Sequence, residues 1–411
     1  MKRSCKRVDI ENWQVIFPWV YDCISRHKRK KDFRRLLLNT GQMTLKEYRK
    51  ALKEKDQTPF ERASKLIAQE AAKRISSRNL KLSPVVIRDM VDKSSGKQRQ
   101  IGKESAMQQV LDYVAKHSCQ EIWRRRIVPQ QVSSIKGKGQ TLGVNMIQKW
   151  IADDNAANKW AKKHGQRYSR KCKYYVKLDV TKCFPSMRLE VFLKFFSKDC
   201  GNRAIIWLWE QLLLSHKVQG YEGFMIGALP SESAAQYLMS FLFRYAMSLH
   251  KEKRGKQVKL ITQALYFMDN QMYFGSSKKD LKTAVRLIIK YAKDEFGITI
   301  KPNWQICCID DTPLDTMGFV IHADAVITVR PRIFIRARRM ALRFLRTNRM
   351  TIEQARRLCS YKGYFYPDPK KAKKRHIYLN LRTRKIERRL QLKRVFRIAA
   401  KVVSDYERSH K

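Results

Sequence analysis

Two aspartates that lie 90 positions apart in the sequence are the residues of this chain best suited to chemistry. Asp179 ends the segment YYVKLD at residues 174–179, and Asp269 ends the segment LYFMD at residues 265–269. Both segments consist mainly of β-forming residues, so each predicts a strand that carries an aspartate at its end. Carboxylates that converge from different strands can bind the metal ions of phosphoryl transfer. The sequence therefore predicts a metal-dependent site built on two strands.

Asn270 directly follows Asp269 and makes this predicted site unusual. Its amide oxygen can bind a divalent cation, but it lacks the negative charge of a carboxylate. We therefore expect weaker metal binding than at a site with two adjacent aspartates. The sequence leaves three outcomes open: a slower enzyme, an enzyme with a different metal preference, or a protein that has lost catalysis.

The elements around the two aspartates predict a split βαββαβ unit, in which the two aspartate-bearing strands are neighbours. The pair Asp269–Asn270 is expected at the tip of a hairpin. The other expected elements are helices near residues 188–198 and 203–215, a Gly/Pro loop at 221–232 that opens a helix ending near 250, a helix at 278–296, and short strand pairs near 298–308 and 317–329.

Both ends of the chain are basic and helical in pattern. Residues 1–80 place apolar residues at helical spacing and carry a cluster of cations at 27–35, which indicates either a solvated face or a grip on a phosphate backbone. From Arg330 onward, 27 Lys or Arg stand against 5 Asp or Glu. Such an excess favours contact with a polyanion.

The region between the N-terminal helices and the first aspartate predicts a hairpin and a loop. Residues 85–102 read as two strands joined by a turn at 94–97, and a helix is expected at about 103–123. Residues 133–140 contain two glycines and two lysines. This pattern fits a loop that approaches phosphates, or a plain turn.

The net charge of +52 indicates a polyanionic partner. The chain has 88 Lys or Arg against 36 Asp or Glu, and nucleic acid is the simplest partner for that excess. Its 411 residues, 44% of them hydrophobic, are enough for two or three folded regions. No apolar run reaches the roughly 20 residues that span a bilayer, so we expect no membrane partner.

The cysteine pattern and the N-terminal segment indicate a cytoplasmic location. The nine cysteines include no CxxC pair, which favours free thiols in a reducing compartment over disulfides or zinc. The segment MKRSCKRVDIENW becomes acidic before an apolar core develops, so no secretory signal is predicted.

Several of these motifs, taken in order, resemble those of reverse transcriptases of the bacterial and phage group that includes diversity-generating retroelements. The segments that carry the resemblance, within about residues 85–330, are SGKQRQIG, KLDVTKCFPSM, MIGALPSE, YFMDN, ITIKPNWQI and DTMGFVIH. Two residues depart from the pattern. Glu232 stands where this family has glutamine, and Asn270 stands where it has the second aspartate of the Tyr-Met-Asp-Asp motif.

The resemblance implies an α+β fold of the right-hand polymerase type, with a ferredoxin-like antiparallel palm sheet between basic helical ends. The implied regions are a basic helical extension at 1–80, fingers at 81–172, a palm at 173–329 and a basic thumb at 330–411.

The resemblance also implies roles for the acidic site. Asp179 would bind two magnesium ions with help from the Val180 carbonyl, and Asp269 would bind at least one; Mn²⁺ is the alternative metal. Phe184 is at the position where this family has a steric gate against the ribose 2′-hydroxyl, although a buried core role is the plain alternative. An intact set of motifs around Asn270 favours an enzyme that works but is altered.

Further residues are implied to bind the incoming nucleotide. Lys97 and Arg99 would clamp the triphosphate, although Lys97 fits an ordinary surface role nearly as well. Gly227 would let the backbone approach the nascent base pair. The resemblance assigns the template–nucleotide contact to Ser231 and Glu232, with Ser231 alternatively a helix cap, and proton donation to pyrophosphate to Lys301.

The expected function is RNA-directed DNA synthesis by nucleotidyl transfer. The expected partners are an RNA template, a DNA primer or product, deoxynucleotides and a small accessory protein, in a bacterial or phage-infected cell. Three alternatives stay open: a catalytically impaired RNA-binding protein of the same fold, a template-independent DNA polymerase in phage defence, and an unrelated basic packaging protein.

Overall fold

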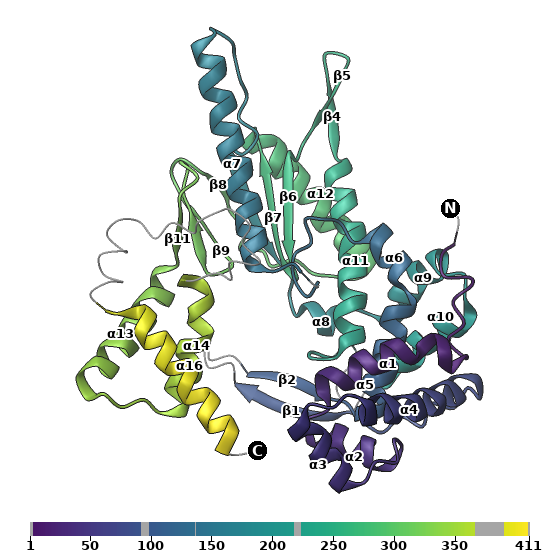
Figure 1. The fold of residues 1–411 in the computed structure, drawn as a ribbon. Coiled ribbons are helices and arrows are strands. Elements are labelled where there is room, and N and C mark those ends of the chain that lie inside the picture. Colours follow the sequence, from purple (N-terminus) through teal and green to yellow (C-terminus); the bar gives the residue numbers. More distant parts are fainter. Residues whose placement is uncertain (1–2, 92–97, 136, 218–222, 366–389, 410–411) are drawn as a thin grey trace. The chain divides into compact units, whose positions relative to one another are not determined.

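The computed structural model describes residues 3–91, 98–135, 137–217, 223–365 and 390–409 (Figure 1). The chain divides into two compact units. The first unit comprises residues 1–129, 180–245 and 287–301, and the second comprises residues 130–179, 246–286 and 302–411. Each unit is therefore assembled from segments that are distant in the sequence.

The N-terminal part of the first unit is helical, as the apolar spacing predicts. Its helices are α1 (Trp13–His27), α2 (Lys31–Asn39), α3 (Leu45–Glu54) and α4 (Thr58–Ser76). A capping box starts α3, where the Thr44 side chain accepts from the Glu47 amide at 3.1 Å. Much of the predicted cation cluster at 27–35 is exposed, from the end of α1 into α2.

The rest of the first unit is a hairpin and a second group of helices. The hairpin pairs β1 (Val86–Val91) with β2 (Gln98–Lys103) in antiparallel register. The helices are α5 (Ala106–Ser118), α6 (Gln120–Arg126), α8 (Cys183–Ser186), α9 (Leu189–Asp199), α10 (Arg203–Leu214), most of α11 (Leu229–Ser248) and the second half of α12 (Lys278–Phe296).

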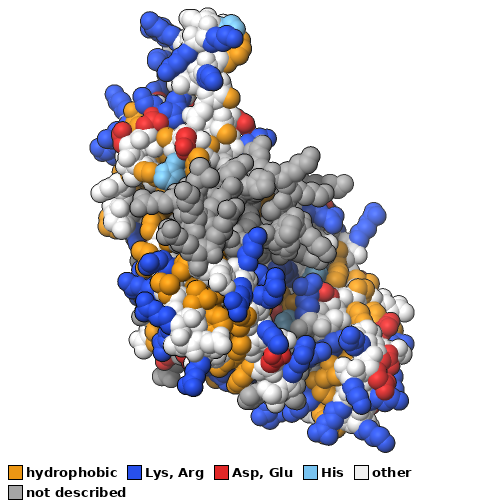
Figure 2. Space-filling model, turned by 60° about the vertical axis from the view of Figure 1, so that its left-hand side comes forward, with side chains coloured by type: hydrophobic (Ala, Val, Ile, Leu, Met, Phe, Trp, Pro, Cys, Tyr) orange, Lys and Arg blue, Asp and Glu red, His pale blue; other side chains and the backbone are white. Residues whose placement is uncertain are grey.

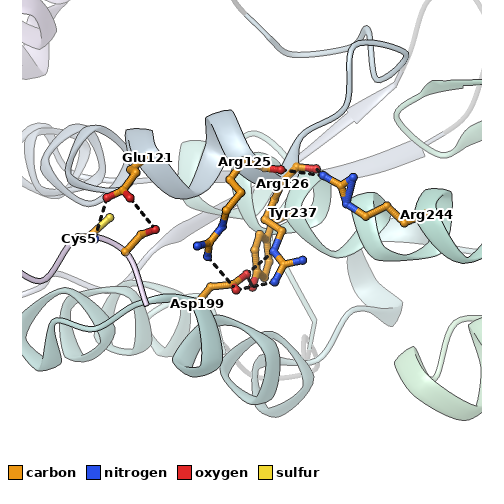
Figure 3. Close-up of polar contacts among 8 residues, drawn as sticks. Cys5, Glu121, Arg125, Arg126, Asp199, Tyr237 and Arg244 are labelled. Atoms are coloured by element: carbon orange, nitrogen blue, oxygen red, sulfur yellow. Dashed lines mark hydrogen bonds and ion pairs between the residues drawn. The ribbon is translucent and has the colours of Figure 1, made fainter. Parts of the chain in front are cut away.

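A buried carboxylate joins the helices of the first unit (Figure 3). The Asp199 side chain is 1% exposed and accepts hydrogen bonds from Arg126 Nε at 2.6 Å and from the Tyr237 hydroxyl at 2.7 Å. Arg125 Nη2 lies 3.0 Å from the same carboxylate. Burial alone would raise the pKa of Asp199, but the Arg126 and Tyr237 hydrogen bonds outweigh it, and the pKa lies below its ordinary value. Asp199 therefore joins the end of α9 to α6 and α11.

The second unit is built on a four-stranded antiparallel sheet. Its strands are β6 (Gln263–Phe267), β7 (Asn270–Gly275), β3 (Tyr174–Asp179) and β8 (Ile306–Cys308), in that spatial order. This order is the one expected of a βαββαβ unit. The expectation that the two aspartate-bearing strands are neighbours is wrong, because β7 lies between β3 and β6 and Asp269 is in the turn between β6 and β7. A separate hairpin pairs β4 (His250–Lys253) with β5 (Lys256–Lys259).

A second, three-stranded sheet and four helices complete the second unit. The strands β9 (Leu314–Thr316), β10 (Phe319–Ile321) and β11 (Ile327–Val329) form the sheet. The helices are α7 (Gln140–Lys163), α13 (Pro331–Thr347), α14 (Ile352–Phe365) and α16 (Leu392–Ser409). One apolar core joins these elements to the four-stranded sheet, with Phe274, Phe319 and Phe396 fully buried in it.

The mixed α+β class and several predicted elements are confirmed. The helix at 278–296 and the hairpin over 85–102 are present, although the predicted turn at 94–97 lies outside the described residues. The strand pair expected near 317–329 is present as β10 and β11, and β9, at residues 314–316, adds a third strand to it. Two expectations are wrong. The helix expected at 103–123 is two helices that meet at Cys119, and β8 pairs with β3 rather than with a strand near 298.

Among the residues that the structure describes, no helix is both long enough and apolar enough to cross a bilayer. The four predicted regions of the chain stay a prediction.

Candidate active site

Asp179 and Asn270 are directly opposite each other in the antiparallel pair formed by β3 and β7. Directly opposed residues of such a pair project from the same face of the sheet, with Cβ atoms about 5 Å apart. The pair Lys177–Met272, two residues along, lies on the same face. The end of this face therefore carries a carboxylate beside an amide.

Asp269 lies in the turn that joins β6 to β7. Phe267 pairs with Asn270, so the loop consists of Met268 and Asp269 alone. Met268 has a φ of 55°, and two-residue hairpin loops need a positive φ at this position. The Asn270 Nδ2 atom lies 3.4 Å from Asp269 Oδ1. The predicted tip was one residue too late: Asn270 is already the first residue of β7.

A cleft of about 520 Å³ opens at this end of the sheet. Every residue that lines it belongs to the second unit. The lining consists of residues 177–179, Phe267, residues 270–272, Asn303, residues 315–318 and Arg330. Its size and polar lining suit a phosphate-bearing ligand better than an apolar one.

An ion pair on the other side of the cleft was not predicted from the sequence. Arg330 Nε donates to Asp315 Oδ1 at 2.6 Å, and Lys177 Nζ donates to the Asp315 carbonyl at 2.9 Å. The cleft therefore contains two cations beside its acidic end. Lys177 is on β3, Asp315 is on β9, and Arg330 precedes α13. Their spacing in the sequence therefore does not predict that they meet.

The structure explains why residue 318, in the segment DTMGFVIH, is a glycine. Its φ is +85°, and a Cβ atom there would lie 2.2 Å from Cε1 of Tyr364. Its carbonyl accepts from the Arg330 amide at 3.0 Å. Only glycine fits this turn between β9 and β10 without displacing Tyr364.

A buried set of polar side chains supports the β6–β7 hairpin. The hydroxyl groups of Tyr266 and Tyr273 are in contact, and Tyr273 donates to Gln271 Oε1 at 2.6 Å. Burial raises the pKa of both tyrosines, so both stay protonated. The Tyr266 backbone also pairs with Gln130 and Val132. These contacts hold the strands on either side of Asp269 in one geometry.

The residues predicted to surround the acidic site belong to the first unit. Val180 forms an isolated antiparallel bridge with Ile300, and the Thr181 amide donates to the Thr299 carbonyl at 2.8 Å. Lys301 follows Ile300 directly. Its backbone therefore lies beside this bridge, and the predicted roles of Val180 and Lys301 stay predictions.

The first unit also brings together Phe184, Gly227 and the β1–β2 hairpin. The Phe224 amide donates to the Phe184 carbonyl at 2.9 Å, and the Gly102 amide donates to the Ile226 carbonyl at 3.1 Å. Gly227 has a φ of +96°, and a Cβ atom there would lie 2.8 Å from Cγ2 of Ile101. The glycine thus allows close approach of the loop to β2, and its predicted approach to a base pair stays a prediction.

The same hairpin carries Arg99, which is exposed and pairs with Met90 across the strands. Lys97 lies outside the described residues, so its predicted role in binding the triphosphate stays a prediction.

Ser231 is inside a buried polar chain and is not a helix cap, because α11 begins at Leu229. Its Oγ lies 3.3 Å from His216 Nδ1, and His216 Nε2 lies 2.7 Å from Glu104 Oε1. Asp112 is buried beside Glu104. Its burial and the nearby Glu104 carboxylate raise the pKa of Asp112 well above its ordinary value. No local sequence pattern predicts the contact between Glu104 and His216, which are more than 100 positions apart. Glu232, the next residue, is half-buried in the first turn of α11.

In the described part of the chain, no three His, Cys, Asp or Glu side chains form a group that could hold a metal ion. At the end of β3 and β7, Asn270 contributes an amide rather than a third carboxylate. Two carboxylates and an amide oxygen are still hard ligands of the kind that Mg²⁺ and Mn²⁺ accept.

The fold and the site together define an α+β protein whose main sheet presents two aspartates and an asparagine at one end. No protein-family model matches the sequence, and no curated protein matches it.

Proposed function

We propose that this chain is an RNA-directed DNA polymerase of the bacterial or phage type. The observation that carries the proposal is the opposition of Asp179 and Asn270 across β3 and β7, with Asp269 in the adjoining turn. Carboxylates that converge at one end of a sheet are the arrangement that metal-dependent nucleotidyl transfer requires. The net charge of +52 supports a nucleic-acid substrate.

In this proposal the second unit provides the palm, and its cleft receives the primer end. The β1–β2 hairpin serves as fingers, and the basic helices α13, α14 and α16 serve as the thumb. Exposed arginines at 332, 338 and 339 on α13 fit a helix that grips a phosphate backbone.

The oxygen atoms at the end of β3 and β7 fit magnesium or manganese, although the site carries only two negative charges. Asp179 and Asp269 would hold the metal ions, with the Val180 carbonyl and the Asn270 amide oxygen as neutral ligands. Bound there, the metal would supply Lewis-acid activation of the primer 3′-hydroxyl and charge neutralisation of the phosphates. With Asn270 in place of a carboxylate, the site has one negative charge fewer.

The nucleotide would be bound mainly by the chain's own cations and packing groups. Arg99 and Lys97 on the fingers would bind the triphosphate, and Lys177 and Arg330 would meet phosphates in the cleft. Phe184 would exclude a ribose 2′-hydroxyl. Because Ser231 is buried against His216, it would position the start of α11, leaving Glu232 nearer to the template.

A second candidate function is RNA binding without catalysis. The observation that favours it is the absence, among the described residues, of three acidic or metal-binding side chains in one group. This rival retains the fold and the basic surface but requires no metal ion.

Primer extension distinguishes these functions. The purified protein is given an RNA template, a DNA primer and deoxynucleotides with either Mg²⁺ or Mn²⁺, beside Asp179→Ala. Template-dependent product that disappears in the variant supports the polymerase. Tight RNA binding with no product under either metal supports the binding protein. Product without any template indicates a template-independent polymerase.

A further inference from the structure

The end of α7 carries a tryptophan outside the core of the second unit. The helix is anchored along its length by Gln148, which donates to the Ala325 carbonyl at 2.9 Å, and by Asn155, which donates to the Ala323 carbonyl at 2.7 Å. Beyond Asn155 the helix continues past these contacts, at the top of Figure 1. Trp160 lies in this extension and is 55% exposed. A large aromatic side chain that lies outside the core and stays exposed indicates a binding surface.

The tryptophan is held in a fixed aromatic pair. The Trp160 and His164 rings are stacked, with centroids 4.3 Å apart and planes inclined by 26°. His164 Nδ1 lies 2.8 Å from the Trp160 carbonyl, which fixes the imidazole at the end of α7. The pair therefore offers a preorganised flat surface to a ligand.

The return segment after α7 fixes this tip to the body of the unit. Asp154 is buried, and its carboxylate accepts from the Tyr168 hydroxyl at 2.9 Å and from the Lys171 and Cys172 amides at 2.8 and 3.0 Å. The carboxylate closest in sequence to the tip is thus occupied in holding the backbone.

The tip is basic without any acidic residue. Between residues 155 and 178 the sequence has eight Lys or Arg and no Asp or Glu. Lys159, Lys162, Lys163 and Arg167 are exposed around the aromatic pair. Figure 2 shows Lys and Arg side chains gathered on this projecting end. No ion pair of the described residues involves these four side chains, so their charges are available to an anion.

We propose that the tip of α7, residues 156–167, is a docking site for single-stranded nucleic acid. An exposed aromatic ring ringed by cations matches the two features of an unpaired strand, a free base face and a phosphate backbone. A duplex offers phosphates but buries its base faces, so it would not engage Trp160. None of the residues that line the cleft belongs to the tip, so the site does not depend on the proposed polymerase activity.

The test uses the full-length protein without divalent metal, so that catalysis cannot contribute. Binding of a short unstructured RNA, a DNA of the same sequence and a matching duplex is measured for wild type, Trp160→Ala and Trp160→Phe. We expect Trp160→Ala to weaken single-strand binding about 5- to 50-fold, with little change for the duplex. Trp160→Phe keeps an aromatic face and should recover most of the affinity. The single strand, RNA or DNA, whose affinity falls more in Trp160→Ala relative to wild type is the preferred ligand of the tip.

The charges are tested with a matched pair of variants. Lys162→Gln with Lys163→Gln should lower the slope of log affinity against log salt by about 1 to 2, because two phosphate contacts are lost. Lys279→Gln with Lys282→Gln removes the same charge from exposed positions on α12 and should leave the slope nearly unchanged.

Photocrosslinking with bromouracil-substituted strands locates the contact, and the crosslinked peptide should contain Trp160. The proposal is overturned if Trp160→Ala binds both single strands as wild type does. It is equally overturned if Trp160→Ala weakens the binding of single strands and of the duplex by the same factor. Crosslinks found only outside residues 156–167 would also overturn it.

Discussion

Asn270 faces Asp179 across the β3–β7 pair and lies on the same side of the sheet. A neutral amide therefore occupies the cross-strand position directly opposite Asp179, where a charge would act most strongly on a metal ion. A neutral amide at that point weakens the attraction for a divalent cation without changing the shape of the site. This relationship leads to the first prediction.

Asn270→Asp should tighten Mn²⁺ binding by at least about 10-fold, because it restores a third carboxylate within a few ångströms of the other two. A titration followed by the Mn²⁺ resonance signal measures the affinity. Asn303→Asp is the matched control, since Asn303 also lines the cleft but is not paired with β3. An equal gain in Mn²⁺ affinity for both variants would mean that a negative charge anywhere in the cleft is enough to tighten binding. That result would contradict a metal site at Asp179, Asp269 and Asn270.

Gly227→Ala should loosen the contact between the 223–228 loop and the β1–β2 hairpin. Alanine at a φ of +96° is strained by about 1 kcal/mol or more, and its Cβ would press on Ile101. Hydrogen exchange should show faster exchange of the Gly102 amide, which donates to Ile226. Gly363→Ala is the control, because Gly363 lies in α14 with open space around it. An unchanged Gly102 amide would show that the loop tolerates a side chain.

Asp199→Asn should destabilise the first unit by about 3 to 5 kcal/mol, because it leaves two arginines without their buried partner. Tyr237→Phe removes one hydrogen bond to the carboxylate and should be milder, about 1.5 to 3 kcal/mol. Urea unfolding measures both. Asp22→Asn breaks an exposed pair with Arg26 and should change stability by less than about 1 kcal/mol.

The pH dependence of this effect has a definite sign. The pKa of Asp199 is lowered in the folded chain, so its contribution is present above the unfolded pKa and is lost as the pH falls through the folded pKa. The difference in stability between wild type and Asp199→Asn should therefore shrink on acidification. A difference that is constant down to the acid limit would contradict the assigned ion pairs.

Asp112→Asn should stabilise the protein at neutral and alkaline pH. Burial and Glu104 raise the pKa of Asp112, so the folded carboxyl binds a proton that the unfolded chain releases above about pH 4. The folded protein therefore loses stability as the pH rises from about 4 to the pKa of Asp112 in the folded state. Asparagine does not titrate, so the Asp112→Asn variant does not lose this stability. Thermal unfolding across pH should show a gain for Asp112→Asn that grows with pH. The exposed Asp153→Asn should show no such trend.

Local patterns were enough to predict the elements but not the pairs of residues that meet across them. The β3 strand, the β6–β7 hairpin and α12 follow from β-forming runs and helical spacing. The turn was misplaced by one residue because a two-residue loop with Met268 at positive φ leaves no glycine signal.

The cleft residues Asp315 and Arg330 and the Ser231–His216–Glu104 chain were missed for another reason. Each depends on contacts between distant segments, which a single sequence does not record. In contrast, the opposition of β3 and β7 could be predicted, because the order of strands and helices limits the sheet to few topologies.

The central claim is that Asp179 and Asp269 together form the catalytic site of a polymerase. The most direct measurement is the rate of single-nucleotide primer extension on an RNA template by Asp179→Asn and Asp269→Asn, with Asp324→Asn as control. Asp324 is exposed on the second unit, and its carboxylate accepts from the Val326 amide at 3.0 Å. We predict that each site variant loses at least about 100-fold in rate, since each removes a metal-binding charge, and that the control keeps the wild-type rate. Wild-type rates in both site variants, or an equal loss in the control, would contradict the account.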